Sequence, residues 1–178
     1  TEKGWLYIFL ANHDQPRTVS KSGNATAEFR ELSSKMLSIF VMTMRGTPYY
    51  YYGDELGMVN IRFNDINDYN DVETRNKYTQ IKNAGGDLDA YMENRKQTSR
   101  ENGRTPFQWD TTENAGFTTG KPWLKVNSNH NIINAEAQEK DPNSVLNYFR
   151  QLVQLRKQNL TLVYGAYTLL DKDNPDVF

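Results

Sequence analysis

Cysteine is absent from this chain of 178 residues, which excludes disulfide bonds, thiolate nucleophiles and zinc sites built on thiolates. Histidine is scarce, with only His13 and His130 present. A metal site therefore has few nitrogen or sulfur ligands, although His13 beside Asp14 could form a metal pair. The length suits about one domain, and a content of 24% charged and 37% hydrophobic residues is ordinary for a folded protein.

An excess of charge of one sign is also missing. The formal net charge is −1, and no block of Lys or Arg runs along the chain. Neither a nucleic-acid groove nor an anionic membrane surface therefore has electrostatic support. No apolar run is long enough to span a bilayer, and no signal peptide is visible. We expect neither a nucleic-acid nor a membrane partner.

The first fifty residues alternate between strand and helix patterns. Trp5–Ala11 is a continuous apolar run, typical of a strand buried on both faces. Ala27–Met44 carries a stripe of apolar residues at helical spacing, and Gly46 suits the end of that helix. A second strand, Tyr49–Tyr52, follows Thr47-Pro48 and closes at Gly53. The apolar stripe of the predicted helix consists of Phe29, Leu32, Met36, Phe40 and Met44. The order of strand, helix and strand is a βαβ unit, which predicts two parallel strands.

The rest of the chain is mostly helical and polar. Asp71 and Asp87 are placed to cap two helices, Val72–Asn83 and Leu88–Lys96, which Gly85-Gly86 separates. Residues 99–140 show no sustained periodicity, and a stretch of that length in a compact domain predicts a functional loop.

Three further elements are predicted near the end of the chain. Asp141-Pro142 has the pattern of a helix start, and the apolar face of that helix continues towards Gln158. Leu160–Leu170 has strand character, and Asn174-Pro175 predicts a turn. The chain stops in Asp176-Val177-Phe178, as though another strand had begun, so we expect a piece of a larger protein.

Polar groups crowd after both predicted strands. Asn12–Arg17 follows the first strand and Gly53–Glu55 follows the second, and chemistry gathers at the carboxyl ends of parallel strands. Each group has a structural alternative. Asn12 and Asp14 can be turn residues that bind nearby backbone amides, and Asp54-Glu55 can cap a helix.

The other polar and aromatic candidates also admit two interpretations. Arg104 lies in a loop punctuated by Gly and Pro, where a surface ion pair is the structural alternative to ligand binding. Trp109 and Trp123 are expected to pack in the core. The tyrosines at 49–52 favour packing within a sheet over stacking against a sugar.

Three motifs in order resemble one family. The sequence reads FLANHDQPR, then RGTPYYYYGDELGM, then SRENGRTPFQWD. Together they resemble glycoside hydrolase family 13, the α-amylase superfamily, in its α-glucosidase branch of oligo-1,6-glucosidases, dextran glucosidases and trehalose-6-phosphate hydrolases. The resemblance implies an α/β fold: residues 1–160 would be the C-terminal part of a (β/α)8 TIM barrel, with its last two strands and their helices. Residues 161–178 would begin a small antiparallel β domain.

The resemblance also implies roles for single residues. Asp14 would stabilise the transition state as the family's third carboxylate, and His13 and Arg104 would bind the sugar. Asp54 and Glu55 match a non-catalytic motif, and Arg17 carries no defined role. The nucleophile and the acid/base of the family lie on earlier strands, which this chain lacks. No cofactor is implied, and the family's calcium loop, where it occurs, falls outside the chain.

The resemblance therefore predicts part of a cytoplasmic retaining α-glucosidase that hydrolyses α-glucosidic bonds in short oligosaccharides. The 178 residues alone are expected to be inactive. The alternative is a non-catalytic member of the superfamily that acts as a binding or transporter-associated subunit, although intact His13, Asp14 and Arg104 argue against a mere scaffold.

Overall fold

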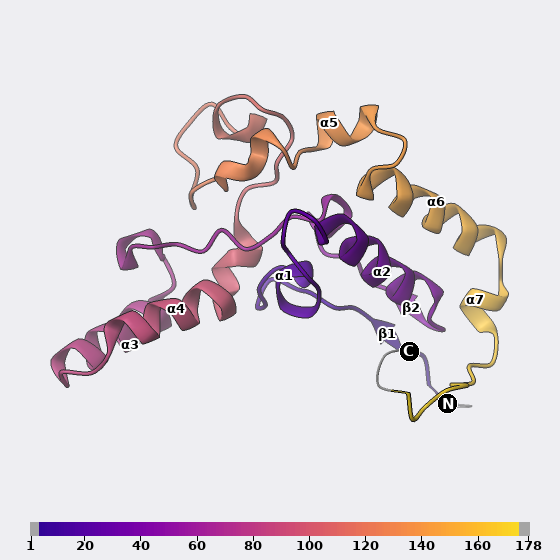
Figure 1. The fold of residues 1–178 in the computed structure, drawn as a ribbon, viewed down its shortest axis with the longest axis horizontal. Coiled ribbons are helices and arrows are strands. Elements are labelled where there is room, and N and C mark those ends of the chain that lie inside the picture. The colour runs from indigo at the N-terminus through magenta and orange to yellow at the C-terminus, as the bar shows by residue number, and fades with distance from the viewer. Residues whose placement is uncertain (1–3, 175–178) are drawn as a thin grey trace.

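The computed structural model describes residues 4–174, which include a small parallel sheet near one end of the molecule (Figure 1). Strand β1 (Tyr7–Ile8) pairs with β2 (Thr47–Pro48), so that Tyr7 faces Thr47 and Ile8 faces Pro48. The chain between them runs through helix α2, which confirms the predicted strand–helix–strand unit with parallel strands.

Helices make up most of the remaining regular structure. Helices α2 and α6 pack side by side, whereas α3 and α4 form a hairpin that projects from the body of the molecule (Figure 1). The α-helices are α1 (Thr18–Ser22), α2 (Arg30–Thr43), α3 (Val72–Asn83), α4 (Leu88–Thr98), α5 (Ala135–Lys140), α6 (Val145–Gln158) and α7 (Thr161–Tyr164). Short 3₁₀ helices are η1 (Asp54–Leu56), η2 (Ile66–Asp68), η3 (Arg100–Arg104), η4 (Glu113–Gly116) and η5 (Ser128–Asn131).

The two helix caps predicted for the hairpin are confirmed. The Asp71 side chain accepts a hydrogen bond from the amide of Thr74, and the Asp87 side chain accepts one from the amide of Ala90. Both carboxylates satisfy amides that have no partner within the helix. Helix α3 has the predicted bounds, and α4 continues two residues past the predicted end.

The strands are shorter and more exposed than predicted. The prediction that Trp5–Ala11 is buried on both faces is wrong for this chain, because Leu6 and Tyr7 are 52% and 68% exposed. A strand needs covering layers on both faces to be buried there, and the described sheet has only two strands. The second strand lies before Tyr49–Tyr52, since the chain turns at Tyr51–Asp54 into η1, and Gly53 takes a φ of 89° there.

The apolar stripe predicted for α2 does not form its buried face. Leu32 and Met36 are exposed, whereas Ser34 and Ser38 are buried. The two serines bond back to carbonyls one helical turn earlier, so small side chains with satisfied hydroxyls occupy the packed face. Part of the apolar stripe instead lines a groove that it shares with residues 167–171.

Two predictions near the C-terminal end are wrong. Helix α6 begins at Val145 rather than at Asp141-Pro142, because Ser144 accepts from the amide of Asn147 and so provides the cap. The predicted strand Leu160–Leu170 begins instead with the helical turn α7. The Arg156 guanidinium binds the carbonyl of Leu162 at 2.9 Å and holds this turn against the end of α2.

Residues 99–140 form a lobe of 3₁₀ turns, loops and the short helix α5, and its packing explains why it is ordered without periodic sequence. Ile133 joins Leu56, Met58 and Leu146 in one apolar cluster, and Leu124 joins a second one. This second cluster consists of Phe63, Tyr69 and Leu124. In addition, Gln108 is fully buried, and its side chain donates a hydrogen bond to that of Asn129 at 3.1 Å.

Some predictions lie beyond the described part. Pro175 of the predicted turn and the strand start at Asp176–Phe178 lie outside residues 4–174. In the range that is described, no helix has the length and apolar character needed to cross a membrane.

Candidate functional site

The turn after β1 presents Asp14 at the carboxyl end of the strand. The amide of Asp14 donates to Oδ1 of Asn12 at 2.8 Å, and the amide of Gln15 donates to the carbonyl of Asn12 at 3.2 Å. The turn interpretation is therefore confirmed for Asn12, whose side chain organises the backbone. The Asp14 carboxylate is not used in this turn and remains available for other partners.

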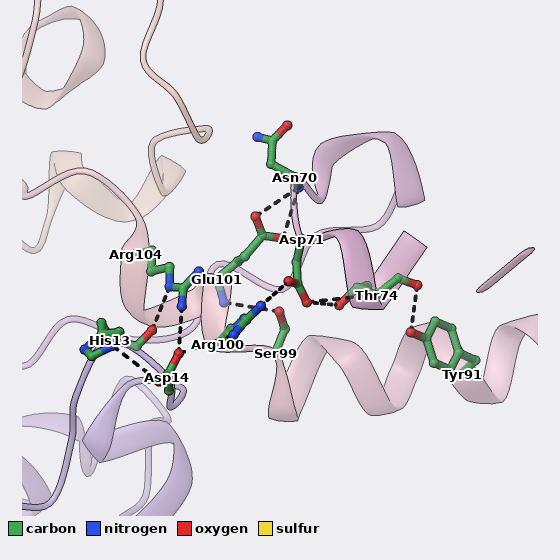
Figure 2. A network of polar contacts seen from close by, with 10 residues as sticks. All are labelled: His13, Asp14, Asn70, Asp71, Thr74, Tyr91, Ser99, Arg100, Glu101 and Arg104. Carbon is green, nitrogen blue, oxygen red and sulfur yellow. Dashed lines mark hydrogen bonds and ion pairs between the residues drawn. The ribbon is translucent and has the colours of Figure 1, made fainter. Parts of the chain in front are cut away.

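Two arginines from η3 contact the Asp14 carboxylate. Arg104 Nη2 lies 2.8 Å from Asp14 Oδ1, and Arg100 Nη1 lies 3.4 Å from the same oxygen. On the other side, His13 Nε2 lies 3.3 Å from Oδ2. We call His13, Asp14, Arg100 and Arg104 the Asp14 cluster (Figure 2). It brings together all three residues that the sequence proposed for the site.

In the Asp14 cluster, the carboxylate is exposed and the Arg104 side chain that binds it is more buried. The Asp14 side chain is 55% exposed and that of Arg104 is 21% exposed. Arg104 also donates from Nε to the carbonyl of His13 at 2.6 Å, so it binds both the backbone and the carboxylate of the turn after β1. Such charge-assisted bonds fix the orientation of the carboxylate, while Oδ2 lies beside the exposed side chain of His13.

Arg100 links the Asp14 cluster to the helical hairpin. Its Nη2 lies 2.5 Å from Asp71 Oδ1, while Asp71 Oδ2 accepts from the Thr74 amide and hydroxyl (Figure 2). Burial alone would raise the pKa of Asp71, but the bonds from Arg100 and Thr74 outweigh it and lower the pKa below its ordinary value. One carboxylate thus caps α3 and anchors Arg100.

Glu101 and Ser99 build the support behind the two arginines. Glu101 is buried, and both of its carboxylate oxygens accept from the amide of Asn70, at 2.9 and 3.1 Å. Burial raises the pKa of Glu101, and the amides of Asn70 and Asp71 oppose that rise. Ser99 accepts from the Glu101 amide at 3.2 Å and so starts η3. These bonds set where Arg100 and Arg104 point.

Asp54 and Glu55 lie outside the Asp14 cluster. Thr18 donates its hydroxyl to Asp54 Oδ2 at 2.7 Å, which ties η1 to α1. Burial raises the pKa of Asp54, with the Thr18 bond opposing it, and burial also raises the pKa of Glu55. Asp54 therefore joins two segments of the chain. The helix-cap interpretation of Asp54-Glu55 is wrong, because Gly53 precedes η1 and no side chain caps it.

The remaining candidates stay apart from the Asp14 cluster. Trp109 packs against Phe107 with ring centres 4.5 Å apart and planes tilted by 58°, yet it is 53% exposed, and Trp123 is 66% exposed. Core packing is therefore wrong for both tryptophans. His130 Nδ1 lies 3.1 Å from the carbonyl of Asn127. Among residues 4–174, no group of three or more His, Cys, Asp or Glu side chains could hold a metal ion.

The comparison with protein families places this arrangement in a known group. The family described as "Alpha amylase, catalytic domain" matches residues 1–165. The chain belongs to the α-amylase family. Within it, the chain is 49% identical to an oligo-1,6-glucosidase of Parageobacillus thermoglucosidasius over 177 residues. It is 47% identical to a trehalose-6-phosphate hydrolase of Bacillus subtilis (strain 168) over 178 residues. These matches cover 99% and 98% of this chain.

Solved members of the family share this local fold closely. The chain superposes on an isomaltulose synthase mutant of Erwinia rhapontici NX5, bound to D-glucose, with a TM-score of 0.91 and 46% identity. A trehalulose synthase mutant in complex with Tris gives 0.93 and 44%. These alignments cover 96% and 98% of this chain but 31% and 32% of the solved chains. The chain likewise spans about 31% of the length of its curated relatives.

Sequence reasoning missed Arg100, Asp71 and the part played by Arg17. No helical pattern marked Arg100, because η3 is a 3₁₀ helix with three residues per turn, in which residues four apart do not lie on one side. Asp71 was predicted only as a helix cap. Its other carboxylate oxygen accepts a hydrogen bond from Arg100, which lies 29 residues later in the sequence. No local pattern predicts a contact of that kind.

Proposed function

We propose that the chain is the C-terminal part of the barrel of a retaining α-glucosidase, and that Asp14 stabilises the transition state for cleavage of an α-glucosidic bond. The observation that carries this proposal is the Asp14 cluster, in which an exposed carboxylate at the end of β1 is held by Arg104 at 2.8 Å. The names of the relatives, oligo-1,6-glucosidase and trehalose-6-phosphate hydrolase, support the class of substrate.

The geometry fits a group that accepts bonds from sugar hydroxyls. Oδ1 of Asp14 is occupied by two guanidinium groups, whereas Oδ2 lies beside the exposed imidazole of His13. Hydroxyls at C2 and C3 of a glucosyl ring would donate to Oδ2, and His13 would donate to the same hydroxyls. As the ring flattens and gains positive charge, these bonds strengthen, so Asp14 would act by binding the transition state better than the substrate.

The proposed reaction needs two further carboxylates and no cofactor. A retaining glycosidase uses a nucleophile and an acid/base that are about 5 Å apart. Both are proposed to lie in the part of the relatives that this chain does not span, as the family resemblance implies. Asp54, which accepts a bond from Thr18, is not proposed for either role. Arg104 would hold the glucose at the closed end of an exo-acting pocket. A short oligosaccharide is the proposed partner, without nucleic acid or membrane, and a cytoplasmic location is proposed from the resemblance alone.

The test is a chimera with a complete barrel. The chain replaces the matching 31% of the relative from Parageobacillus thermoglucosidasius. We expect hydrolysis of an aryl α-glucoside and of isomaltose, with the α-anomer of glucose as the first product seen by NMR. A folded chimera without turnover would favour the alternative of a non-catalytic binding subunit, and a β-anomer product would contradict retention.

A second outcome of the same chemistry is glucosyl transfer. The chain is 46% and 44% identical to an isomaltulose synthase and a trehalulose synthase, about as similar as it is to the hydrolases. The acceptor, water or a sugar, would then distinguish hydrolysis from transfer. Incubating the chimera with sucrose and analysing the products separates them: isomaltulose or trehalulose indicates transfer, and free glucose with fructose indicates hydrolysis.

A further inference from the structure

Arg17 is a fully buried cation whose hydrogen-bond partners are neutral. Its guanidinium donates to the carbonyl of Asn102 at 3.1 Å, to that of Tyr52 at 2.6 Å and to that of Thr105 at 3.2 Å, with the Thr105 hydroxyl at 3.1 Å. The ring of Tyr52 lies 4.8 Å from its central carbon. A buried charge is costly unless it is well bonded, so this position is specified by both segments that the guanidinium reaches, Tyr52 and residues 102–105.

The bonds of Arg17 and Arg104 are reciprocal. Arg17, at the end of the turn after β1, binds the carbonyls of residues 102 and 105, which bracket Arg104. Arg104, at the end of η3, binds the carbonyl of His13 and the carboxylate of Asp14 in that same turn. Each of the two segments, the turn after β1 and the end of η3, thus contributes one guanidinium that binds the backbone of the other. The two segments also touch at Gly103, where an added Cβ would lie 2.4 Å from the carbonyl oxygen of Gln15.

We infer that Arg17 is a positioning residue, which sets the separation of Asp14 and Arg104 by holding the backbone on both sides of Arg104. The kinetic part of this inference rests on the proposed function, whereas the positioning itself does not. Arg17 makes no contact with the Asp14 carboxylate among the bonds described for it, so its effect passes through the backbone at residues 102–105.

Lysine cannot replace this arginine. Three carbonyls from two separate loops meet one planar guanidinium, whose five N–H groups diverge in fixed directions. An ammonium group is compact and cannot reach Tyr52, Asn102 and Thr105 at once. In Arg17→Lys we therefore expect the bonds to residues 102 and 105 to weaken and the segment 99–105 to become mobile.

Arg156 offers a matched control for a merely structural role. It is 6% exposed, and its guanidinium also donates to backbone carbonyls, those of Met42, Met44, Gly46 and Leu162. These carbonyls belong to the end of α2, the turn into β2 and α7, not to the Asp14 cluster. Arg17→Lys and Arg156→Lys therefore remove comparable buried bonds, and only the first reaches the site.

The experiment compares the two variants in the chimera by hydrogen exchange and by kinetics. We expect Arg17→Lys to speed amide exchange in residues 99–105 about tenfold or more, and Arg156→Lys to leave that segment unchanged. We also expect Arg17→Lys to lower kcat by about 100-fold with a smaller change in KM, since a small misplacement of catalytic groups can cost that much. If Arg17→Lys fails to fold, Thr105→Val removes one bond of Arg17 and should shift both measurements in the same direction.

Each outcome decides the inference. Unchanged exchange in residues 99–105 overturns it, whatever the kinetics. Equal losses of kcat in Arg17→Lys and Arg156→Lys also overturn it, because they would show a general loss of stability. An inactive but folded chimera counts against the proposed function only, and the exchange measurements then still decide whether Arg17 positions the segment of Arg104.

Discussion

Arg104 binds Asp14 and the residue before it with one guanidinium: Nη2 lies 2.8 Å from Asp14 Oδ1, and Nε lies 2.6 Å from the carbonyl oxygen of His13. Rotation of the carboxylate is therefore coupled to the backbone of its own turn. The Asn12 side chain fixes the same turn through the Asp14 amide. Asp14 is thus presented to a ligand in one orientation, as a preorganised electrostatic group requires.

The first prediction concerns the charge of Asp14. In the chimera, Asp14→Asn keeps the shape of the side chain but replaces a carboxylate oxygen with an amide. We expect the free energy of transition-state binding, calculated from the change in kcat/KM, to weaken by about 3–4 kcal/mol, the range found for such groups. The loss of substrate affinity should be much smaller. Steady-state kinetics on an aryl α-glucoside measure this. Turnover near that of the unsubstituted protein would leave Asp14 as a turn residue only.

The second prediction separates the two tasks of Asp71. Asparagine caps helices about as well as aspartate, so Asp71→Asn should keep the cap of α3 and lose only the ion pair with Arg100, at most about 1 kcal/mol of stability. Asp71→Ala should lose about 1 kcal/mol more. Asp87 caps α4 through the Ala90 amide and serves as the control, because Asp87→Asn should be nearly neutral. Urea unfolding of these three variants and of the unsubstituted chain gives the comparison.

The third prediction follows from the lowered pKa of Asp71. A carboxyl group whose pKa is lower in the folded state stabilises the fold above its ordinary pKa of 3.8 and loses that contribution as the pH falls through the folded value. Stability measured from pH 5 downwards should therefore fall less steeply in Asp71→Asn than in the unsubstituted chain. Parallel curves would show that Arg100 does not stabilise the ionised carboxylate.

The fourth prediction tests the close contact of the two site segments. Gly103→Ala would place a methyl group 2.4 Å from the carbonyl oxygen of Gln15, which is backbone and cannot turn aside. We expect a loss of about 1–3 kcal/mol of stability, as for an overpacked core. Gly120→Ala is the control, since the nearest atom to its Cβ is 3.8 Å away. Thermal unfolding that ranks both variants alike would contradict the close contact.

Local patterns predicted the parts of this fold that local chemistry determines. The caps at Asp71 and Asp87 were found because a carboxylate one residue before a helix binds its first amides. The parallel pairing of β1 and β2 followed from the helix between them. The grouping of His13 and Asp14 with Arg104 came from the family resemblance, because nothing local to residue 104 indicates a contact 90 residues away.

The wrong predictions share a physical cause in long-range packing. Ser34 and Ser38 occupy the packed face of α2, where the Ser38 hydroxyl bonds that of Tyr50, although apolar spacing favours the stripe through Leu32 and Met36. The turn of α7 replaces a strand because Arg156 reaches the carbonyl of Leu162 from the preceding helix. Apolar periodicity cannot reveal a buried guanidinium that selects carbonyls from several segments.

The last prediction concerns the 178-residue chain by itself: it should release no p-nitrophenol from an aryl α-glucoside and no glucose from maltose, isomaltose or trehalose-6-phosphate. The proposed mechanism needs a nucleophile and an acid/base about 5 Å apart. Asp54 is bonded to Thr18, and Tyr7 of β1 and Phe9, which follows that strand, are 68% and 48% exposed. Turnover that Asp54→Asn or Glu55→Gln abolishes would make Asp54 and Glu55 the catalytic pair and overturn the assignment of their roles.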